Sequence, residues 1–215
     1  MAKLGAVYEI SEADPGGLFN AWDVVVGYMA VTLTAAIRTE EAHLTEKFGA
    51  EPESLQTALG FEPTGTGSVC YRSAAGAAFA QTQADVLALL RDDPETPDVE
   101  VTQDDFGFTW LVVTGDKDDM AGLCTDLHAV NTTLELNGFD SGLLCSMVPF
   151  ANASGQRFGL TYLYKQGTFY PFVPVDGQRR DNLLEMQVRD LVTNELPVEP
   201  QLSRWMALWD APVLR

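Results

Sequence analysis

The chain has 215 residues, of which 46% are hydrophobic, and carries 31 acidic against 13 basic side chains. This apolar fraction suffices for the packed core of about one domain, which excludes a wholly disordered chain or a repeat array. A formal net charge of −18 disfavours nucleic-acid binding through a general basic surface, because such a chain repels phosphate backbones.

Residues 1–54 are expected to form an N-terminal helical segment, separate from an α+β domain over residues 55–215. We see no secretory signal, since Glu9, Glu12 and Asp14 precede the first long apolar stretch, and therefore expect a cytoplasmic protein. That stretch, Leu18 to Ile37, carries a single formal charge at Asp23. Its apolar residues recur at helical spacing between polar ones, which favours a helix packed on a globular body or lying at a membrane interface over a membrane-spanning helix.

From about Leu55 the sequence alternates between short strands and amphipathic helices. The β-branched and aromatic content predicts strands at 67–71, 99–101 and 107–113. Helical periodicity predicts a helix over 77–90 and another that follows the acidic loop 116–119 and ends at Asn137-Gly138. One face of each helix is predicted to pack inward. In the first helix this face contains Phe79, Thr82, Val86 and Leu89/Leu90, and in the second it contains Met120, Leu123, Leu127, Val130 and Leu134.

The last third is predicted to begin with an antiparallel meander of strands at 143–150, 157–165 and 168–173, because turn-forming residues separate them. Pro171 and Pro174 place the third strand at a sheet edge, since proline cannot donate a ladder hydrogen bond. A final helix over 181–196 leads into a tail that contains Trp205 and Trp209. The fold class is therefore α+β: a mostly antiparallel sheet with helices packed on one face.

Side chains that could carry catalysis or bind a metal are scattered. His128 follows Cys124 by one helical turn, but no further ligand has a matching spacing, so a packed histidine is favoured over a metal ligand. Ser68 lies among glycines but lacks a nucleophile elbow. Cys70 and Cys145 fall on predicted strands and are expected to be buried in a protein of a reducing compartment. We therefore expect no enzymatic activity, no cofactor and no metal site.

Aromatic and basic side chains concentrate in the last third, where seven acids balance seven bases. Exposed rings and arginines without catalytic groups are typical of protein-contact surfaces. Alternatively, the tail packs on the edge strand and the rings are ordinary core residues; the sequence leaves both interpretations open. The candidate protein-binding residues are Tyr164, Phe169, Tyr170, Phe172, Arg179, Arg180, Trp205 and Trp209.

Several segments resemble a known family. They are FAQTQADV (79–86), DDFGFTWLVV (104–113), TDLHAVNTTLELNGF (125–139), LLCSMVPF (143–150), TYLYKQGTFYPFVP (161–174), RRDNLLEMQ (179–187) and LPVEPQLSRWMALW (196–209). From about Leu55 to the C-terminus, the chain is similar to the PspA-associated protein PspAB of actinobacteria and haloarchaea; residues 1–54 are not part of this resemblance. The family is named for its association with PspA, the membrane-stress protein of the phage-shock response, and no catalytic activity or cofactor is established for it. The architecture also resembles the type III secretion chaperone-like, YbjN-like fold, which implies peptide or protein binding.

We therefore expect a non-enzymatic adaptor or chaperone-like protein that acts in the envelope-stress response by contacting a PspA-like partner. The rival hypothesis is a small ligand-binding protein or enzyme with a pocket between sheet and helices, and it predicts a cavity that converges on His128 and Asp126. A third hypothesis is peripheral membrane binding through Leu18–Ile37. The sequence makes no prediction about oligomeric state.

Overall fold

The computed structural model describes residues 55–91, 98–176, 178–194 and 196–215. The expected N-terminal helical segment, including Leu18–Ile37, lies outside these residues. The helices are α4 (Leu55–Leu59), α5 (Ala77–Arg91), α6 (Met120–Leu136) and α7 (Asn182–Val192), with short 3-10 turns η1 (Asp140–Gly142), η2 (Leu202–Arg204) and η3 (Pro212–Leu214). The strands are β1 (Phe61–Pro63), β2 (Thr66–Tyr71), β3 (Asp98–Gln103), β4 (Thr109–Thr114), β5 (Leu143–Asn152), β6 (Arg157–Leu163), β7 (Thr168–Phe172), β8 (Pro174–Val175) and β9 (Arg179–Arg180).

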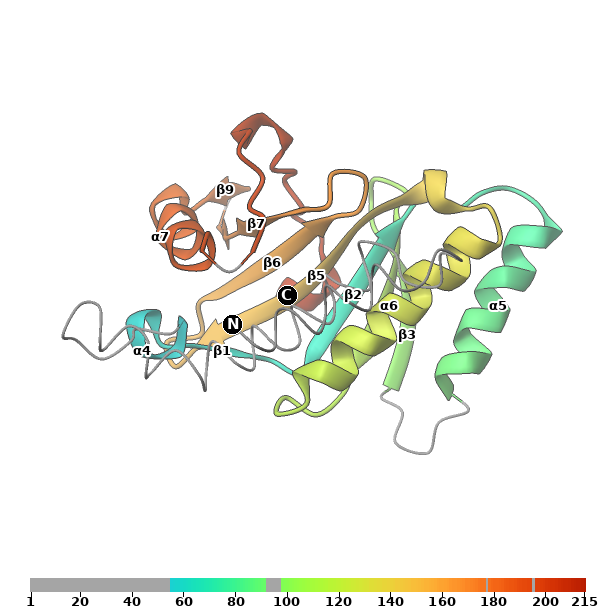
Figure 1. The fold of residues 1–215 in the computed structure, drawn as a ribbon, viewed down its shortest axis with the longest axis horizontal. Helices are drawn as coiled ribbons and strands as arrows, with labels where there is room; N and C mark the ends of the chain where they lie inside the picture. The colour runs from blue at the N-terminus through green and yellow to red at the C-terminus, as the bar shows by residue number, and fades with distance from the viewer. Residues whose placement is uncertain (1–54, 92–97, 177, 195) are drawn as a thin grey trace, which may run out of the picture.

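The main sheet is antiparallel throughout, in the order β3-β4-β2-β5-β6-β7 (Figure 1). Strand β5 is long enough to pair with two strands on one side: its first half pairs with β2 and its last residues pair with β1. Gly65 makes the bend between these two strands with φ +76°, and a Cβ there would lie 2.8 Å from the Lys117 backbone nitrogen. Glycine is required at this position because both the dihedral angle and the space exclude a side chain.

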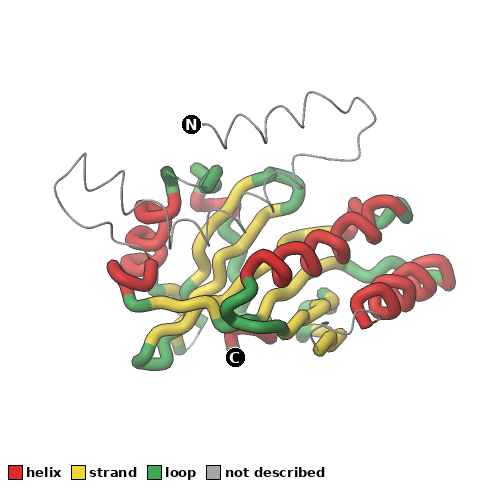
Figure 2. Tube along the Cα trace, turned by 60° about the horizontal axis from the view of Figure 1, so that its bottom comes forward, coloured by secondary structure: helices red, strands yellow, loops and turns green. Residues whose placement is uncertain are grey.

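The helices cover one face of this sheet. Buried residues of α5, α6 and α7 join one hydrophobic cluster with inward side chains of the strands, and α5 lies beside α6 (Figure 2). The periodicity predicted these faces well: every apolar residue predicted for the face of α6 is buried. In α5 the prediction holds for Phe79, Thr82, Val86 and Leu90, whereas Leu89 is exposed. The α+β class with helices on one face is therefore confirmed.

The opposite face of the sheet is covered by the C-terminal tail. Turn η3 contacts β2, β4, β5 and β6, and Trp205, Ala211 and Val213 join a second hydrophobic cluster with Trp110 and Met147. The sheet is therefore buried on both faces, by helices on one side and by irregular chain on the other. No helix in the described part of the chain is long and apolar enough to cross a membrane.

Several short elements of the fold were not predicted, among them α4, which has five residues, strand β1 and the β8–β9 hairpin. Strand β1 has only three residues, and the β8–β9 hairpin has two residues in each strand, so neither is long enough to show an alternating pattern. The predicted meander is confirmed as β5-β6-β7, with β7 at the end of the sheet order as the prolines indicated.

Candidate functional site

The structure brings the predicted aromatic residues together, but inside the protein. Phe169, Tyr170 and Phe172 of β7 are all 0% exposed, and Trp205 is also buried. The interpretation of these four rings as an exposed contact surface is therefore corrected in favour of the alternative, in which they belong to the core. Tyr164 and Trp209 are half-buried, Arg180 is partly buried, and Arg179 is exposed.

The rings are buried because both faces of β7 are covered. Phe169 points toward the helices and packs on Tyr162, with ring centroids 4.9 Å apart. Tyr170 and Phe172 point to the opposite face, where they meet Trp205 at 5.7 Å and Trp209 at 5.2 Å. Side chains of a strand alternate between faces, so an edge strand rich in aromatic residues needs a cover on each side.

The tail also pairs with the outer edge of β7. The Phe169 amide donates to the Pro197 carbonyl at 2.8 Å, and the Glu199 amide donates to the Phe169 carbonyl at 2.8 Å, which forms a parallel bridge to Val198. The tail thereby satisfies backbone hydrogen-bonding groups of β7 that an edge strand would otherwise leave unpaired.

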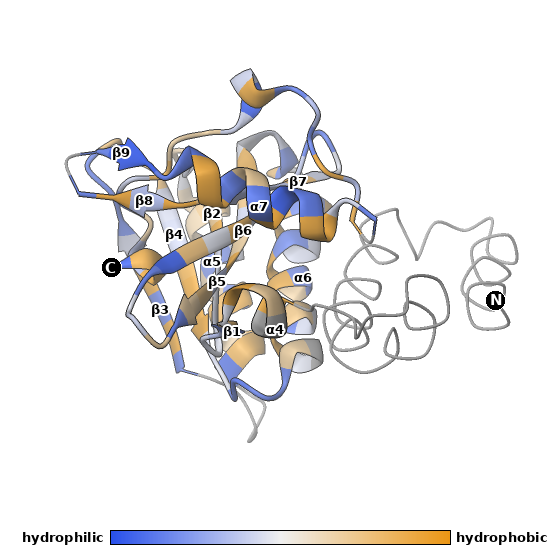
Figure 3. Cartoon of the chain, turned by 90° about the vertical axis from the view of Figure 1, so that its left-hand side faces the viewer, coloured by the Kyte–Doolittle hydropathy of each residue, from blue (hydrophilic) through white to orange (hydrophobic). Residues whose placement is uncertain are grey.

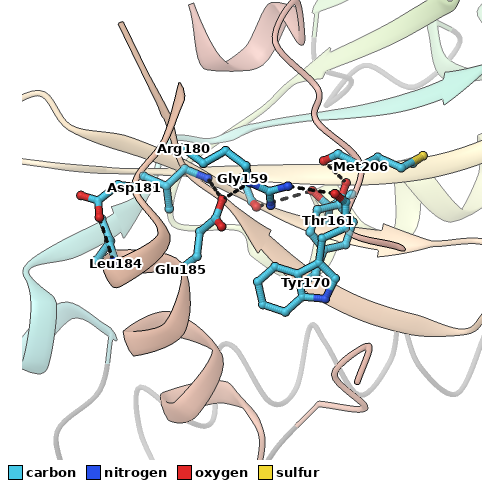
Figure 4. Close-up of polar contacts among 10 residues, drawn as sticks. Gly159, Thr161, Tyr170, Arg180, Asp181, Leu184, Glu185 and Met206 are labelled. Atoms are coloured by element: carbon cyan, nitrogen blue, oxygen red, sulfur yellow. Dashed lines mark hydrogen bonds and ion pairs between the residues drawn. The ribbon is translucent and has the colours of Figure 1, made fainter. Parts of the chain in front are cut away.

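Arg180 connects the hairpin, α7 and the tail (Figure 4). Its Nε donates to Glu185 Oε1 at 2.7 Å, its Nη1 donates to the Trp205 carbonyl at 2.8 Å, and its guanidinium lies 5.0 Å from the centre of the Phe172 ring. Glu185 is buried and also accepts the Val173 amide at 2.9 Å. Arg180 therefore links the hairpin and α7 to the tail.

Glu199 is a second buried acid that stabilises the tail. Its carboxylate accepts the Gln201 amide at 2.9 Å and the Thr168 hydroxyl at 2.9 Å, and Arg204 Nη1 lies at 3.7 Å. The amide hydrogen bond from Gln201 is the main reason why the pKa of Glu199 is lowered, with further contributions from Thr168 and Arg204. Sequence reasoning missed this residue, although an acid within LPVEP is a signal that could have pointed to it.

Apolar and basic side chains of the hairpin, α7 and η2 remain exposed to solvent. Leu183 is 72% exposed on the first turn of α7, Leu202 is 56% exposed in η2, and Val175 faces its cross-strand partner Arg179 in the hairpin. We use the name C-terminal surface for five exposed residues of the hairpin, α7 and η2 taken together: Val175, Arg179, Leu183, Leu202 and Arg204. Figure 3 shows the hydrophilic character of β9 and the mixed character of α7.

His128 is not among the residues that line a pocket beside η1. That pocket has a volume of about 180 Å³ and is lined by Arg72, Ser73, Ala74, Phe79, Phe139, Ser141 and Gly142. His128 is half-buried on α6, with its ring nitrogens 3.4 and 3.2 Å from the Thr132 hydroxyl. Among the described residues no group of three or more His, Cys, Asp or Glu side chains could hold a metal ion.

All three cysteines are buried, which confirms the prediction for Cys70 and Cys145. Cys70 and Cys145 lie directly opposite each other on β2 and β5. The hydrogen bond between these two thiols and their burial raise the pKa of Cys70 far above its ordinary value. Burial raises the pKa of Cys124 to about 12. The Cys70 and Cys124 thiols are therefore neutral at physiological pH, which makes them poor nucleophiles.

Comparison with known protein families gives a match. The sequence profile of the PspA associated protein B family covers residues 26–213, and so includes residues 26–54, which the resemblance seen in the sequence did not reach. No curated protein and no solved structure matches the chain. Because the family match covers well over half of the residues, the chain belongs to the PspA associated protein B family.

Proposed function

We propose that this protein is a non-enzymatic, cytoplasmic adaptor that binds PspA and acts with it in the envelope-stress response. The observation that carries the proposal is the family match over residues 26–213. Contacts of the described side chains support the non-enzymatic part of the proposal. Arg180, Glu185 and Glu199, which lie near the aromatic strand, make hydrogen bonds that stabilise the hairpin and the tail. A chaperone-like mode of action, in which the protein holds a segment of its partner, belongs to the same proposal.

The C-terminal surface is the contact region that we assign to this function. Its leucines and arginines are residue types that contribute to protein interfaces when they become buried on binding. The backbone that carries these residues is held by the hydrogen bonds of Arg180 and Glu199. Little conformational freedom is therefore lost when a partner binds. The balanced charge of residues 141–215 also avoids the repulsion that the acidic remainder of the chain would exert on an acidic partner.

The test is capture of PspA from the same organism by the full-length chain. Leu183→Glu and Leu202→Glu, made together, should weaken binding roughly tenfold or more, because two exposed apolar contacts become charged. Binding is measured by calorimetry or biolayer interferometry, and circular dichroism establishes that each variant is folded. Leu136→Glu is the matched control, since Leu136 is a strongly exposed leucine at the end of α6 and should leave binding unchanged.

Two results would contradict the proposal at different levels. Failure of the wild-type chain to bind PspA removes the function. Normal binding by the double variant, with the wild type also binding, retains the function and moves the contact away from the C-terminal surface.

A further inference from the structure

Two cysteine side chains face each other inside the main sheet. Cys70 of β2 and Cys145 of β5 are register partners, and each is 1% exposed. Their thiols are joined by a hydrogen bond, so the two sulfur atoms are in contact. The chain has three cysteines, and the third, Cys124, belongs to the hydrophobic cluster on the opposite face of the sheet. Cys70 and Cys145 are therefore the two cysteines of this chain that can react with each other in the folded protein.

The pairing of the strands sets the distance between these two residues. The Tyr164 amide donates to the Leu144 carbonyl at 3.2 Å, so the backbone of Leu144 faces β6 and the backbone of Cys145, the next residue of β5, faces β2. Cys70 and Cys145 therefore form a hydrogen-bonded pair of the antiparallel ladder, in which the Cα atoms are about 5.5 Å apart. Disulfides most often join Cα atoms about 5.5–6 Å apart. The backbone is thus placed for a disulfide between β2 and β5.

The C-terminal tail covers the two thiols. Both cysteines belong to the hydrophobic cluster that includes Trp205, Ala211 and Val213 of the tail, and turn η3 contacts both β2 and β5. The hydrogen bond with Cys145, together with burial, raises the pKa of Cys70 far above its ordinary value, so its thiol stays neutral. While the tail is in place, an oxidant therefore meets neither an exposed nor an ionised sulfur at Cys70. Local opening of the tail would admit both the oxidant and water.

We propose that Cys70 and Cys145 form a reversible disulfide between β2 and β5 when an oxidant reaches them through an opened tail. With hydrogen peroxide, one sulfur attacks a peroxide oxygen, the O–O bond breaks, and a sulfenic acid forms while the departing hydroxide takes up the thiol proton and leaves as water. The second sulfur attacks the first, the S–OH bond breaks, and the departing hydroxide takes up the second thiol proton. Two thiols and one peroxide thus give one disulfide and two waters, and a dithiol reductant reverses the link by exchange. This modification goes beyond the adaptor function and does not depend on whether PspA is the partner.

The test is peroxide oxidation of the reduced full-length chain, followed by intact-mass measurement and by peptide mapping after the remaining thiols are alkylated. We expect the loss of two hydrogen atoms and a linked pair of peptides that contains Cys70 and Cys145, both reversed by dithiothreitol. The link should raise the melting temperature by roughly 5–10 °C, because a crosslink between distant residues restricts the unfolded chain. Cys124→Ala should form the same link, whereas Cys145→Ala should not.

The part played by the tail is tested by the same substitution on the two faces of the sheet. Val213→Ala weakens the packing of η3 beside the cysteines and should speed up disulfide formation several-fold. Val130→Ala is the matched control, since Val130 of α6 is also buried but lies in the cluster on the helix-covered face, and its rate should stay near that of the wild type. Circular dichroism establishes that both variants are folded.

Three results would overturn the proposal. If the folded wild type gives no linked peptide while the urea-unfolded chain is oxidised, the pair does not react within the fold. A link that includes Cys124 would assign the disulfide to other residues. Equal rates for Val213→Ala and Val130→Ala would show that the tail does not control access to the thiols.

Discussion

Glu185 is a residue whose role becomes clear only from the three-dimensional structure. Its position between Leu184 and Val188 on the apolar face of α7 could have indicated burial from the sequence, because an acid at an inward helical position needs a partner. Its partners could not be foreseen: one is the guanidinium of Arg180 in the hairpin and the other is the amide at the end of β7. The carboxylate is therefore a structural link, and its removal leaves two donors without an acceptor.

Glu185→Ala should lower the free energy of unfolding by about 3 kcal/mol, because breaking a buried ion pair leaves its partner uncompensated. Chemical denaturation monitored by fluorescence measures this change. Asp190→Ala on the same helix is the control: its ion pair with Arg189 is exposed, and the loss should stay below about 1 kcal/mol. Equal losses for the two variants would contradict the structural role of Glu185.

Among the elements, β7 and the tail show where sequence reasoning succeeds and where it stops. The strand and its place at the edge followed from two prolines and the turn residues around it. The cover did not follow, because the tail has neither a helical nor an alternating pattern and packs through single residues such as Trp205 and Val213. Whether an aromatic strand is exposed or buried thus depended on irregular chain that carries no periodic signal.

Phe169→Ala should destabilise the protein by about 3–5 kcal/mol, the usual cost of removing a buried aromatic ring. This replaces the expectation that follows from an exposed ring, namely weaker partner capture with nearly unchanged stability. Thermal unfolding is the measurement, and Phe106→Ala, at an exposed phenylalanine in the β3–β4 turn, should change the melting temperature little. A melting temperature for Phe169→Ala close to that of the wild type would contradict the burial of β7.

For the whole molecule, the sequence predicted the α+β class, the three long helices and the meander, because each rests on a periodic pattern. The pocket and the two carboxylate networks were not predicted, since each joins residues far apart in the chain: Arg72 with Ser141, Arg180 with Trp205, and Glu199 with Thr168. Local patterns determine the elements, but contacts between distant segments determine the sites.

The stability of the molecule should depend on pH through Glu199. Its pKa in the folded protein lies below the ordinary value of 4.5, so the unfolded chain binds more protons in the acidic range. The contribution of Glu199 is therefore fully present at neutral pH and is lost as the pH falls below about 4.5. The difference in unfolding free energy between wild type and Glu199→Gln should shrink between pH 6 and pH 3.5 in denaturation experiments, and a difference that stays constant would contradict the assignment.

At the end of the sheet opposite β7 lies β3, whose Asp98 and Glu100 side chains are exposed. If two copies of β3 paired edge to edge, carboxylates would face carboxylates. This repulsion opposes the intermolecular pairing to which exposed edge strands are prone. In a crowded cell, these acids would help to keep neighbouring molecules from polymerising through β3.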